Sequence, residues 1–287
     1  MSTGTQPTLL IINADDFGLT EGVCRAILRA HEDGVVTSTS ALAIAPAFRR
    51  CAGWLADAPD LGIGVHLAAV GEDPPLLSAH EIPTLVDERG RLPRSWRQLL
   101  PKVALHRVDP ADLEREFAAQ GDLVRATLGP GRITHLDTHQ HVHLWPDIGS
   151  IVCELAQRWG IPAVRGTQAA RRSAIGLAVN RLGRGLGRKI SEAGLQSPEA
   201  FRGLDDAGAV STARLVDMID GLAASRAASA EVGVHPGEAD DPDLARYAWG
   251  YRWGEELAAL LAPDTRRAVE RAGFVLGTFG DLPRVVT

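Results

Sequence analysis

The sequence predicts an irregular, TIM-like (β/α) barrel, with parallel strands inside and helices outside. Short, nearly continuous apolar runs, typical of strands buried on both faces of a parallel sheet, alternate with amphipathic helical segments along the chain. The chain has 287 residues, of which 45% are hydrophobic and 23% charged. This is ordinary for a barrel, since such barrels of ~250 residues are usually single domains. We therefore expect one domain over residues 1–287.

In the first quarter of the chain, predicted strands alternate with predicted helices. The strands are short apolar or β-branched runs, and the helices carry apolar residues at spacings of three and four. Thr20 has a side chain suited to capping the first helix. In chain order the predicted elements are strand 8–14, helix 20–34, strand 35–44, helix 46–60 and strand 61–67.

The middle of the chain contains an insertion and then returns to the alternation. Residues 71–110 are rich in proline, arginine and acidic residues, with only a weak helical stretch near 96–105. Long insertions on such scaffolds are often lids or substrate walls, and we expect one here. The elements that follow are helix 110–128, the segment 133–143, helix 148–159 and strand 162–165.

Residues 166–190 are unusual because they contain six basic residues and no acidic one. A basic amphipathic segment can lie on a membrane surface, and the plainer alternative is a solvated helix packed on the barrel. The five glycines between positions 166 and 187 favour a mobile segment over a firm helix. The basic residues are Arg171, Arg172, Arg181, Arg184, Arg188 and Lys189.

The last part of the chain repeats the alternation and adds an aromatic cluster. The predicted elements are helix 212–229, strand 230–234, helix 255–272 and strand 273–278. Four aromatic residues lie between Tyr247 and Trp253. Aromatic rings of this kind either stack on sugar rings or belong to the core, and the sequence leaves both open.

Four histidines and one aspartate alternate with other residues in the segment 133–143. In an extended strand all five would point to one face, which would be too polar for a core. If the strand ends near Thr138, histidines four residues apart still lie close together. Imidazole and carboxylate are the usual ligands of a divalent metal, so the segment indicates a metal site. The five residues are His135, Asp137, His139, His141 and His143.

Other polar residues follow the ends of predicted strands. Asp15 and Asp16 follow the first strand, His66 lies at the end of the strand 61–67, and His235 follows the strand 230–234. The carboxyl ends of barrel strands meet on one rim, where ligands bind. The simplest site is one metal held by two histidines and one aspartate, with a second carboxylate as general base and another histidine as general acid. That machinery hydrolyses an amide or an ester.

The sequence also argues against several classes of protein. The net charge of −6 and the pI near 5.9 argue against nucleic-acid binding. No Gly-x-Ser-x-Gly elbow, Gly-x-Gly-x-x-Gly motif or P-loop is present. The scattered Cys24, Cys51 and Cys153 indicate reduced thiols. Without a secretory signal or an apolar run of ~18 residues, we expect a soluble cytoplasmic protein.

The motifs Asn13-Ala-Asp-Asp-Phe-Gly18, Gly64-Val-His66, Thr134–His143 and His235-Pro236 resemble those of the YdjC-like carbohydrate deacetylase family. Members of that family have an irregular (β/α) barrel and remove acetyl groups from N-acetylated sugars with a divalent metal. The resemblance implies a metal held by Asp16, His66 and His139, with Asp15 as general base and His235 as general acid. It implies supporting or substrate-facing roles for His135, Asp137, His141, His143 and Arg165.

Two motifs, His235-Pro-Gly-Glu238 and Ala245-Arg-Tyr-Ala-Trp-Gly-Tyr-Arg-Trp253, resemble those of the hopanoid-biosynthesis-associated branch (HpnK) of that family. This implies de-N-acetylation of an N-acetylglucosaminyl hopanoid, such as N-acetylglucosaminyl bacteriohopanetetrol, with residues 166–190 docking peripherally at the inner membrane face. A soluble chitooligosaccharide is the alternative substrate. A metallophosphoesterase with two or three metal ions is the alternative enzyme. The metal, whether Zn, Mg, Mn, Fe or Co, and a homodimeric state are left open by the sequence.

Overall fold

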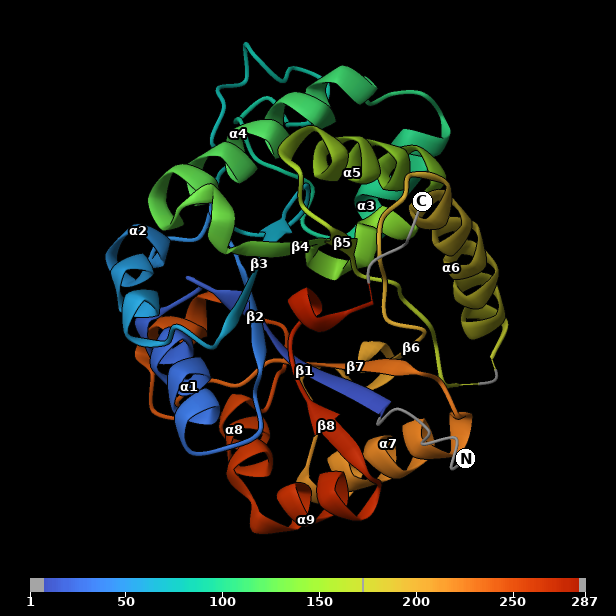
Figure 1. Ribbon diagram of the computed structural model, residues 1–287. Helices are drawn as coiled ribbons and strands as arrows, with labels where there is room; N and C mark the ends of the chain where they lie inside the picture. Colours follow the sequence, from blue (N-terminus) through green and yellow to red (C-terminus); the bar gives the residue numbers. More distant parts are fainter. Residues whose placement is uncertain (1–7, 172, 284–287) are drawn as a thin grey trace.

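The computed structural model describes residues 8–171 and 173–283, and its centre is a curled parallel sheet (Figure 1). Within these residues the sheet has eight strands in the order β5-β4-β3-β2-β1-β7-β6, with β8 also paired to β1. The predicted irregular barrel of parallel strands with outer helices is confirmed. The strands are β1 (Thr8–Phe17), β2 (Ser38–Ala41), β3 (Gly62–Leu67), β4 (Ile133–Thr138), β5 (Ala163–Val164), β6 (Ala200–Arg202), β7 (Ser229–Val234) and β8 (Phe274–Leu276).

Strand β1 is the centre of the sheet because three other strands pair with it. β7 pairs with residues 9–14 along one edge. β8 pairs with residues 8–10 and β2 with residues 13–17, so these two strands share the other edge. Residues 10–17 are all buried, as expected for a strand covered on both faces.

The sheet closes only loosely between β5 and β6. Ala163 of β5 forms a single parallel bridge to Gln196, just before β6 begins. The Val164 N–H donates to the Gln196 carbonyl over 2.9 Å, and the Gln196 N–H donates to the Pro162 carbonyl over 2.9 Å. One bridge in place of a strand pair is what makes this barrel irregular.

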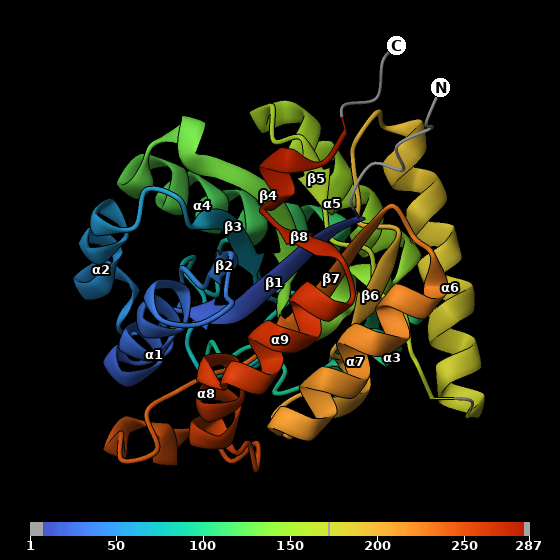
Figure 2. The ribbon, with the colours of Figure 1, turned by 60° about the horizontal axis from the view of Figure 1, so that its bottom comes forward.

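The helices lie outside the sheet (Figures 1 and 2). α4 packs against β3, α5 against β4 and β5, and α7 against β6. The helices are α1 (Glu21–Glu32), α2 (Phe48–Cys51), α3 (Trp96–Ala104), α4 (Pro110–Leu128), α5 (Pro146–Trp159), α6 (Ala174–Glu192), α7 (Thr212–Ser225), α8 (Trp253–Leu261) and α9 (Pro263–Arg271). Short 3-10 helices span Ala52–Asp57, Pro130–Arg132, His139–Leu144, Leu204–Asp206, Pro242–Arg246 and Phe279–Asp281.

Most predicted elements are present, with changed ends. The Thr20 side chain caps α1 by accepting from the Val23 N–H, and α4 has its predicted bounds. The strand predicted over 35–44 is shorter, and the helix predicted over 46–60 is a four-residue α-helix followed by a 3-10 helix. β6 was not predicted, since three residues of strand give no recognisable period.

Two helical predictions were wrong. Residues 174–192 form a regular helix in spite of their glycines, because Ser173 caps the Gly176 N–H and one face is packed against α5. The helix predicted over 255–272 is instead two helices, α8 and α9. Pro263 has no N–H to continue the first helix and is favourable as the first residue of the second.

The 71–110 insertion is packed onto the barrel through apolar side chains that belong to the main hydrophobic core. Ile82 and Leu85 are fully buried, and Leu92 is nearly so. Its helical stretch is present as α3, whose first residue Trp96 is partly exposed. Among the described residues, no helix has both the length and the hydropathy required to cross a membrane.

Candidate active site

Asp15 and Asp16 lie at the end of β1, where the strand departs from regular pairing. The register between β1 and β2 shifts between Ala14 and Phe17, and Asp16 has a left-handed backbone with φ of 67°. Aspartate adopts this conformation more readily than most residues. Because of the shift, the two adjacent carboxylates meet different partners.

Asp16, His66 and His139 each bring one ligand atom to a common point. Asp16 Oδ1 lies 3.1 Å from His139 Nδ1 and 3.4 Å from His66 Nε2, and the two nitrogens are 3.3 Å apart. The three residues come from β1, β3 and the 3-10 helix after β4, at the carboxyl ends of neighbouring strands. All three are buried. The structure therefore brings together the three residues that the family resemblance implies as metal ligands.

This cluster has the chemistry of a divalent metal site. One carboxylate and two imidazoles are common metal ligands, and the second oxygen of Asp16, Oδ2, is buried without a hydrogen-bond partner. His66 Nδ1 lies 2.8 Å from Asp137 Oδ1. A proton on Nδ1 shared with this carboxylate leaves Nε2 free to face an ion.

The same carboxylate controls the protonation of His66. Burial by itself lowers the pKa of His66, but the charge and hydrogen bond of Asp137, together with Asp15 and Asp16, raise this pKa to about 9. A metal must therefore displace a proton from His66 when it binds.

Arg165 lies beneath the site and joins Asp15 to Asp137. Its Nη1 donates to Asp15 Oδ2 over 2.7 Å and lies 2.6 Å from Asp137 Oδ2, and its Nη2 donates to Asp15 Oδ1 over 2.6 Å. Burial would raise the pKa of Asp15, but Arg165 and the nearby histidines hold it well below its usual value. Asp15 is therefore ionised at neutral pH in spite of being buried.

Glu231 is a third carboxylate on Arg165. Its Oε1 accepts from Arg165 Nε over 2.7 Å, and the side chain is fully buried on β7. Burial, followed by repulsion from Asp15 and Asp137, raises the pKa of Glu231 to about 8, although Arg165 opposes this shift. One arginine cannot balance three buried carboxylates, so Glu231 holds its proton most tightly.

His235 lies on the other side of Asp15 from the histidine cluster. Its Nε2 is 3.9 Å from Asp15 Oδ2, and its ring makes an edge contact with Tyr251. The backbone N–H of His235 donates to Glu256 Oε2 over 2.6 Å. The end of β7 therefore presents an imidazole to the same space as the Asp15 carboxylate.

The expectation that all five alternating residues share one face was wrong after Thr138, where β4 ends. Gln140 and His141 have left-handed backbones with φ of 55° and 52°, which turn the following residues. His141 faces the cavity and His143 does not. His143 Nδ1 lies 2.6 Å from the Thr138 hydroxyl, and His143 Nε2 lies 3.1 Å from the Arg165 carbonyl oxygen. His143 therefore connects the end of β4 to the backbone at Arg165.

His135 lies inside the barrel and does not reach the cavity. Its ring stacks on Phe279, with ring centroids 3.7 Å apart, and its Nε2 lies 3.1 Å from the Ser40 hydroxyl. That hydroxyl donates to Asp137 Oδ2 over 2.9 Å. Burial lowers the pKa of His135 to about 3, so this ring is neutral. It supports Asp137 through Ser40.

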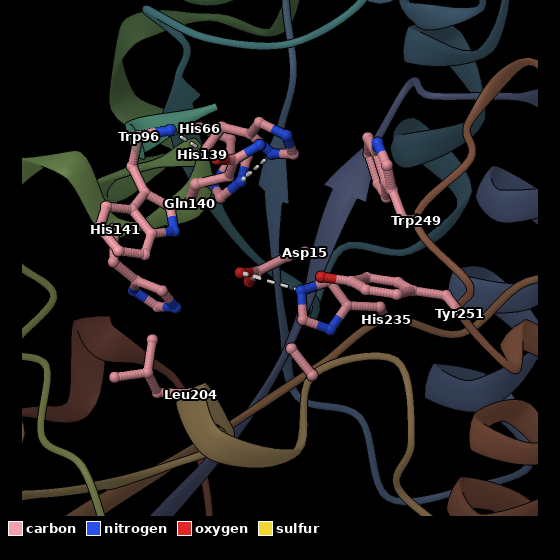
Figure 3. A pocket seen from close by; sticks show the side chains of 11 residues that line it. Asp15, His66, Trp96, His139, Gln140, His141, Leu204, His235, Trp249 and Tyr251 are labelled. Carbon is pink, nitrogen blue, oxygen red and sulfur yellow. Dashed lines mark hydrogen bonds and ion pairs between the residues drawn. The ribbon is translucent and has the colours of Figure 1, made fainter. Parts of the chain in front are cut away.

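A cavity of about 290 Å³ opens onto the side chains of Asp15, His66, His139 and His235. Figure 3 shows Asp15 at its centre, with His235, Tyr251 and Trp249 on one side and His139, Gln140, His141 and Trp96 on the other. The aromatic cluster is divided between two surroundings: Tyr247 and Trp253 are buried, as expected for core residues, whereas Trp249 and Tyr251 line the cavity, and their stacking on a sugar ring stays a prediction. Trp249 donates to Glu72, and its ring lies 5.2 Å from that of His139.

Several residues of the site were not found from the sequence. Among them, Glu231 could have been recognised from the sequence, because a glutamate inside the apolar run Ser229–Val234 has to be buried or paired. Ser40 and Glu256 have no signal, because their roles depend on strands and helices that meet only in the fold. Asn13, which donates to Asp15 Oδ1 over 2.7 Å, was part of a quoted motif but had no assigned role.

A parallel α/β barrel with buried carboxylates and imidazoles at the carboxyl ends of its strands is an architecture typical of hydrolases with a metal at one rim. Residues 9–271 match the model of the family described as YdjC-like protein. The chain therefore belongs to the YdjC-like family, and the predicted family is confirmed.

Relatives and a solved structure match over nearly the whole chain. A carbohydrate deacetylase from Brevibacillus brevis is 31% identical, covering 95% of this chain and 99% of its own. A chitooligosaccharide deacetylase from Serratia marcescens is 31% identical, covering 96% and 99%. The crystal structure of an Enterococcus faecalis protein, provisionally named a cellobiose-phosphate cleavage protein, has a TM-score of 0.77 at 28% identity, covering 96% and 98%.

Proposed function

We propose that this chain is a metal-dependent carbohydrate de-N-acetylase that releases acetate from an N-acetylglucosaminyl substrate. The observation that carries the proposal is the cavity in which Asp15 and His235 lie beside the cluster of Asp16, His66 and His139. Relatives that cover nearly the whole chain and are named carbohydrate and chitooligosaccharide deacetylases support it.

In the proposed mechanism Asp15 accepts a proton from the attacking water as the oxygen adds to the amide carbonyl carbon. His235, when protonated, donates a proton to the amide nitrogen, so that the C–N bond breaks and acetate and an amine are formed. Arg165 and Asn13 fix the direction of the Asp15 carboxylate. A metal held by Asp16, His66 and His139 would polarise the carbonyl oxygen and the water.

We propose one ion per chain. A second group of potential ligands, made of Asp15, His66 and Asp137, shares His66 with the first. Its two carboxylates are already engaged by Arg165, which disfavours a second cation there. This speaks against a metallophosphoesterase with several ions. Two imidazole ligands fit Zn, Mn, Fe or Co better than Mg, which prefers oxygen ligands.

The test is acetate release from N,N′-diacetylchitobiose and from an N-acetylglucosaminyl lipid. Enzyme stripped by a chelator and enzyme reloaded with each metal are measured side by side, and the metal per chain is counted. We expect acetate only from reloaded enzyme, at one ion per chain. Phosphate release from phosphate esters with two or more ions would contradict the proposal.

As a finer proposal, the substrate is lipid-borne, as in the hopanoid branch of the family, and the protein docks peripherally on a membrane. In support, α6 has an exposed basic stripe at helical spacing, made of Arg181, Arg184 and Arg188, which follows the exposed Leu177. The segment before α6 is tied to the cavity rim, because the Arg171 N–H donates to Asp205 beside the cavity residue Leu204. Arg172 lies outside the described residues.

Co-sedimentation with anionic liposomes tests the membrane contact. We expect the wild type to bind and a variant with Arg181, Arg184 and Arg188 changed to Gln to lose most of the binding. A variant with Arg29, Arg49 and Arg267 changed to Gln, which removes the same charge from other helices, should still bind. Equal binding by both variants, or no binding by the wild type, would leave a soluble chitooligosaccharide as the substrate.

A further inference from the structure

A cavity of about 350 Å³ lies between α5 and α6, apart from the one that holds Asp15 and His235. Among the described residues, the two cavities have no lining residue in common. Around this α5–α6 cavity, α6 packs against α5 and against the 3-10 helix His139–Leu144 (Figure 1). Nothing in the proposed mechanism uses this space.

The lining of the α5–α6 cavity contains four basic side chains and, within the part of the chain that the structure describes, no acidic one. The basic residues recur along α6 at spacings of three and four, so they share one face of the helix. Burial lowers the pKa of His143, which also lines the cavity, to about 4, so the positive charge comes from α6 alone. The four basic residues are Arg181, Arg184, Arg188 and Lys189.

These four positive charges are not neutralised by ion pairs. Among the described residues, none of the four side chains has a carboxylate partner, whereas Arg171, just before α6, pairs with Asp206. The acidic residues of α5 nearest in sequence, Asp147 and Glu154, are exposed and do not line the cavity. The cavity therefore has a net positive charge, which favours an anion as its ligand.

Lys189 is held at the cavity by a contact with α5. Its Nζ donates to Ser150 Oγ over 2.8 Å, and this hydroxyl donates to the Pro146 carbonyl over 3.1 Å. The lysine is half-buried, while the three arginines are exposed. An ammonium group has three N–H donors, so the contact with Ser150 leaves two of them for an anion.

We infer that the α5–α6 cavity binds a phosphate or diphosphate group. Arginine matches phosphate through two parallel N–H···O bonds, and lysine binds it as a point charge. A phosphate monoester carries a charge of about −1.5 to −2 at neutral pH, so one or two phosphate groups balance the four cations. The volume also falls within the range of small-molecule sites, about 300–1,000 Å³.

The phosphate belongs either to a free molecule or to the headgroup of a membrane lipid, since both present the same chemistry. The inference does not depend on the proposed deacetylation, because the α5–α6 cavity is separate from the reactive one. It also differs from the proposed membrane contact, in which the arginines act as surface charges and need no cavity.

Two glycines of α6 provide a matched pair of variants. Gly185 lines the cavity, whereas Gly187, two residues further on, lies on the other side of the helix and does not. A Cβ at either position would meet nothing within 4 Å, so both sites accept a side chain. Gly185→Glu and Gly187→Glu therefore add the same charge to the same helix, but only the first adds it to the cavity.

Isothermal titration calorimetry with inorganic pyrophosphate tests the site, and circular dichroism checks that each variant is folded. We expect the wild type to bind one pyrophosphate per chain. Gly185→Glu should bind at least about tenfold more weakly, and Gly187→Glu within about twofold of the wild type. Lys189→Gln, which removes a charge and adds none, should also weaken binding.

Co-sedimentation of the same variants with phosphatidylglycerol vesicles distinguishes the two sources of phosphate. Loss of vesicle binding in Gly185→Glu but not in Gly187→Glu identifies a lipid headgroup, and vesicle binding that is equal in the two variants or absent identifies a free phosphorylated molecule. Pyrophosphate binding that is absent, or that is the same in the two glutamate variants, would overturn the site, because an anion held at the metal cluster or by diffuse charge would not distinguish them.

Discussion

Asp15 and Asp16 are neighbours in the chain but have different surroundings. Asp15 accepts two hydrogen bonds from Arg165, whereas Asp16 faces two histidines and keeps one buried oxygen without a partner. We predict that Asp15→Asn lowers kcat by about 10²–10⁴-fold while the metal content per chain stays at the wild-type value. Acetate release and metal analysis on the same sample check this. An active Asp15→Asn enzyme would exclude Asp15 as the base.

Glu231 makes the stability of the protein depend on pH. Its pKa is raised to about 8 by burial and by two nearby carboxylates, from an ordinary value near 4.5. The folded protein therefore holds a proton that the unfolded chain releases, and the stability that this gives is complete below about pH 4.5. It is lost as the pH rises through 8.

We predict that Glu231→Gln, which keeps the acceptor oxygen without a charge to ionise, reduces this loss. Urea unfolding at pH 5, 7 and 8.5 should show the free energy of unfolding falling less with pH in the variant than in the wild type. If the free energy of unfolding falls equally with pH in both proteins, Glu231 is ionised throughout this range.

At the scale of the helices, two glycines in similar conformations have opposite surroundings. A Cβ on Gly121 of α4 would lie on the ring of Trp159 in α5, whereas a Cβ on Gly187 of α6 would meet nothing within 4 Å. We predict that Gly121→Ala destabilises the protein by about 1–3 kcal/mol through overpacking. Gly187→Ala should stabilise it by about 0.5–1 kcal/mol, since alanine loses less conformational freedom in a helix. Thermal unfolding of the two variants shows whether each substitution lowers or raises the stability of the protein. A change of stability in the same direction for both variants would contradict the close packing at Gly121 and the open space at Gly187.

At the scale of the whole molecule, the histidine and aspartate cluster joins segments far apart in the chain. A metal bound there should stabilise the fold, because only the folded chain brings Asp16, His66 and His139 together. We predict that saturating zinc raises Tm by about 5–10 °C, from about 2.7 kcal/mol of binding at a hundredfold excess over Kd. Since the pKa of His66 is raised to about 9, the gain should grow as the pH rises from 6 to 9.

Asp16→Asn should abolish most of this gain in Tm. Asp60→Asn, which removes an exposed carboxylate near β3, should keep it. A gain of the same size in both variants would place the bound metal elsewhere on the protein.

The barrel and the gathering of aspartates and histidines on one rim followed from the sequence because they depend on local patterns. Apolar runs identify parallel strands, and polar residues just after such runs lie on one rim of the barrel. The choice of Asp16, His66 and His139 among these polar residues came from the family resemblance. The extent of β2, the nature of α2 and the presence of β6 were not predictable, since their runs are too short to show a period.

The direction of each side chain was decided only by the tertiary structure. Four alternating histidines have the same local pattern, but a turn at Gln140 and His141 sends them to different places: one into the barrel, two to the cavity and one beneath it. Contacts such as Arg165 with Glu231, or Trp249 with Glu72, join residues from distant parts of the chain. Local patterns in the chain indicate which strand ends carry carboxylates and imidazoles. Which of these groups reach the cavity, and which of them meet, depends on the packing of strands and loops, because those contacts depend on backbone positions that no local pattern specifies.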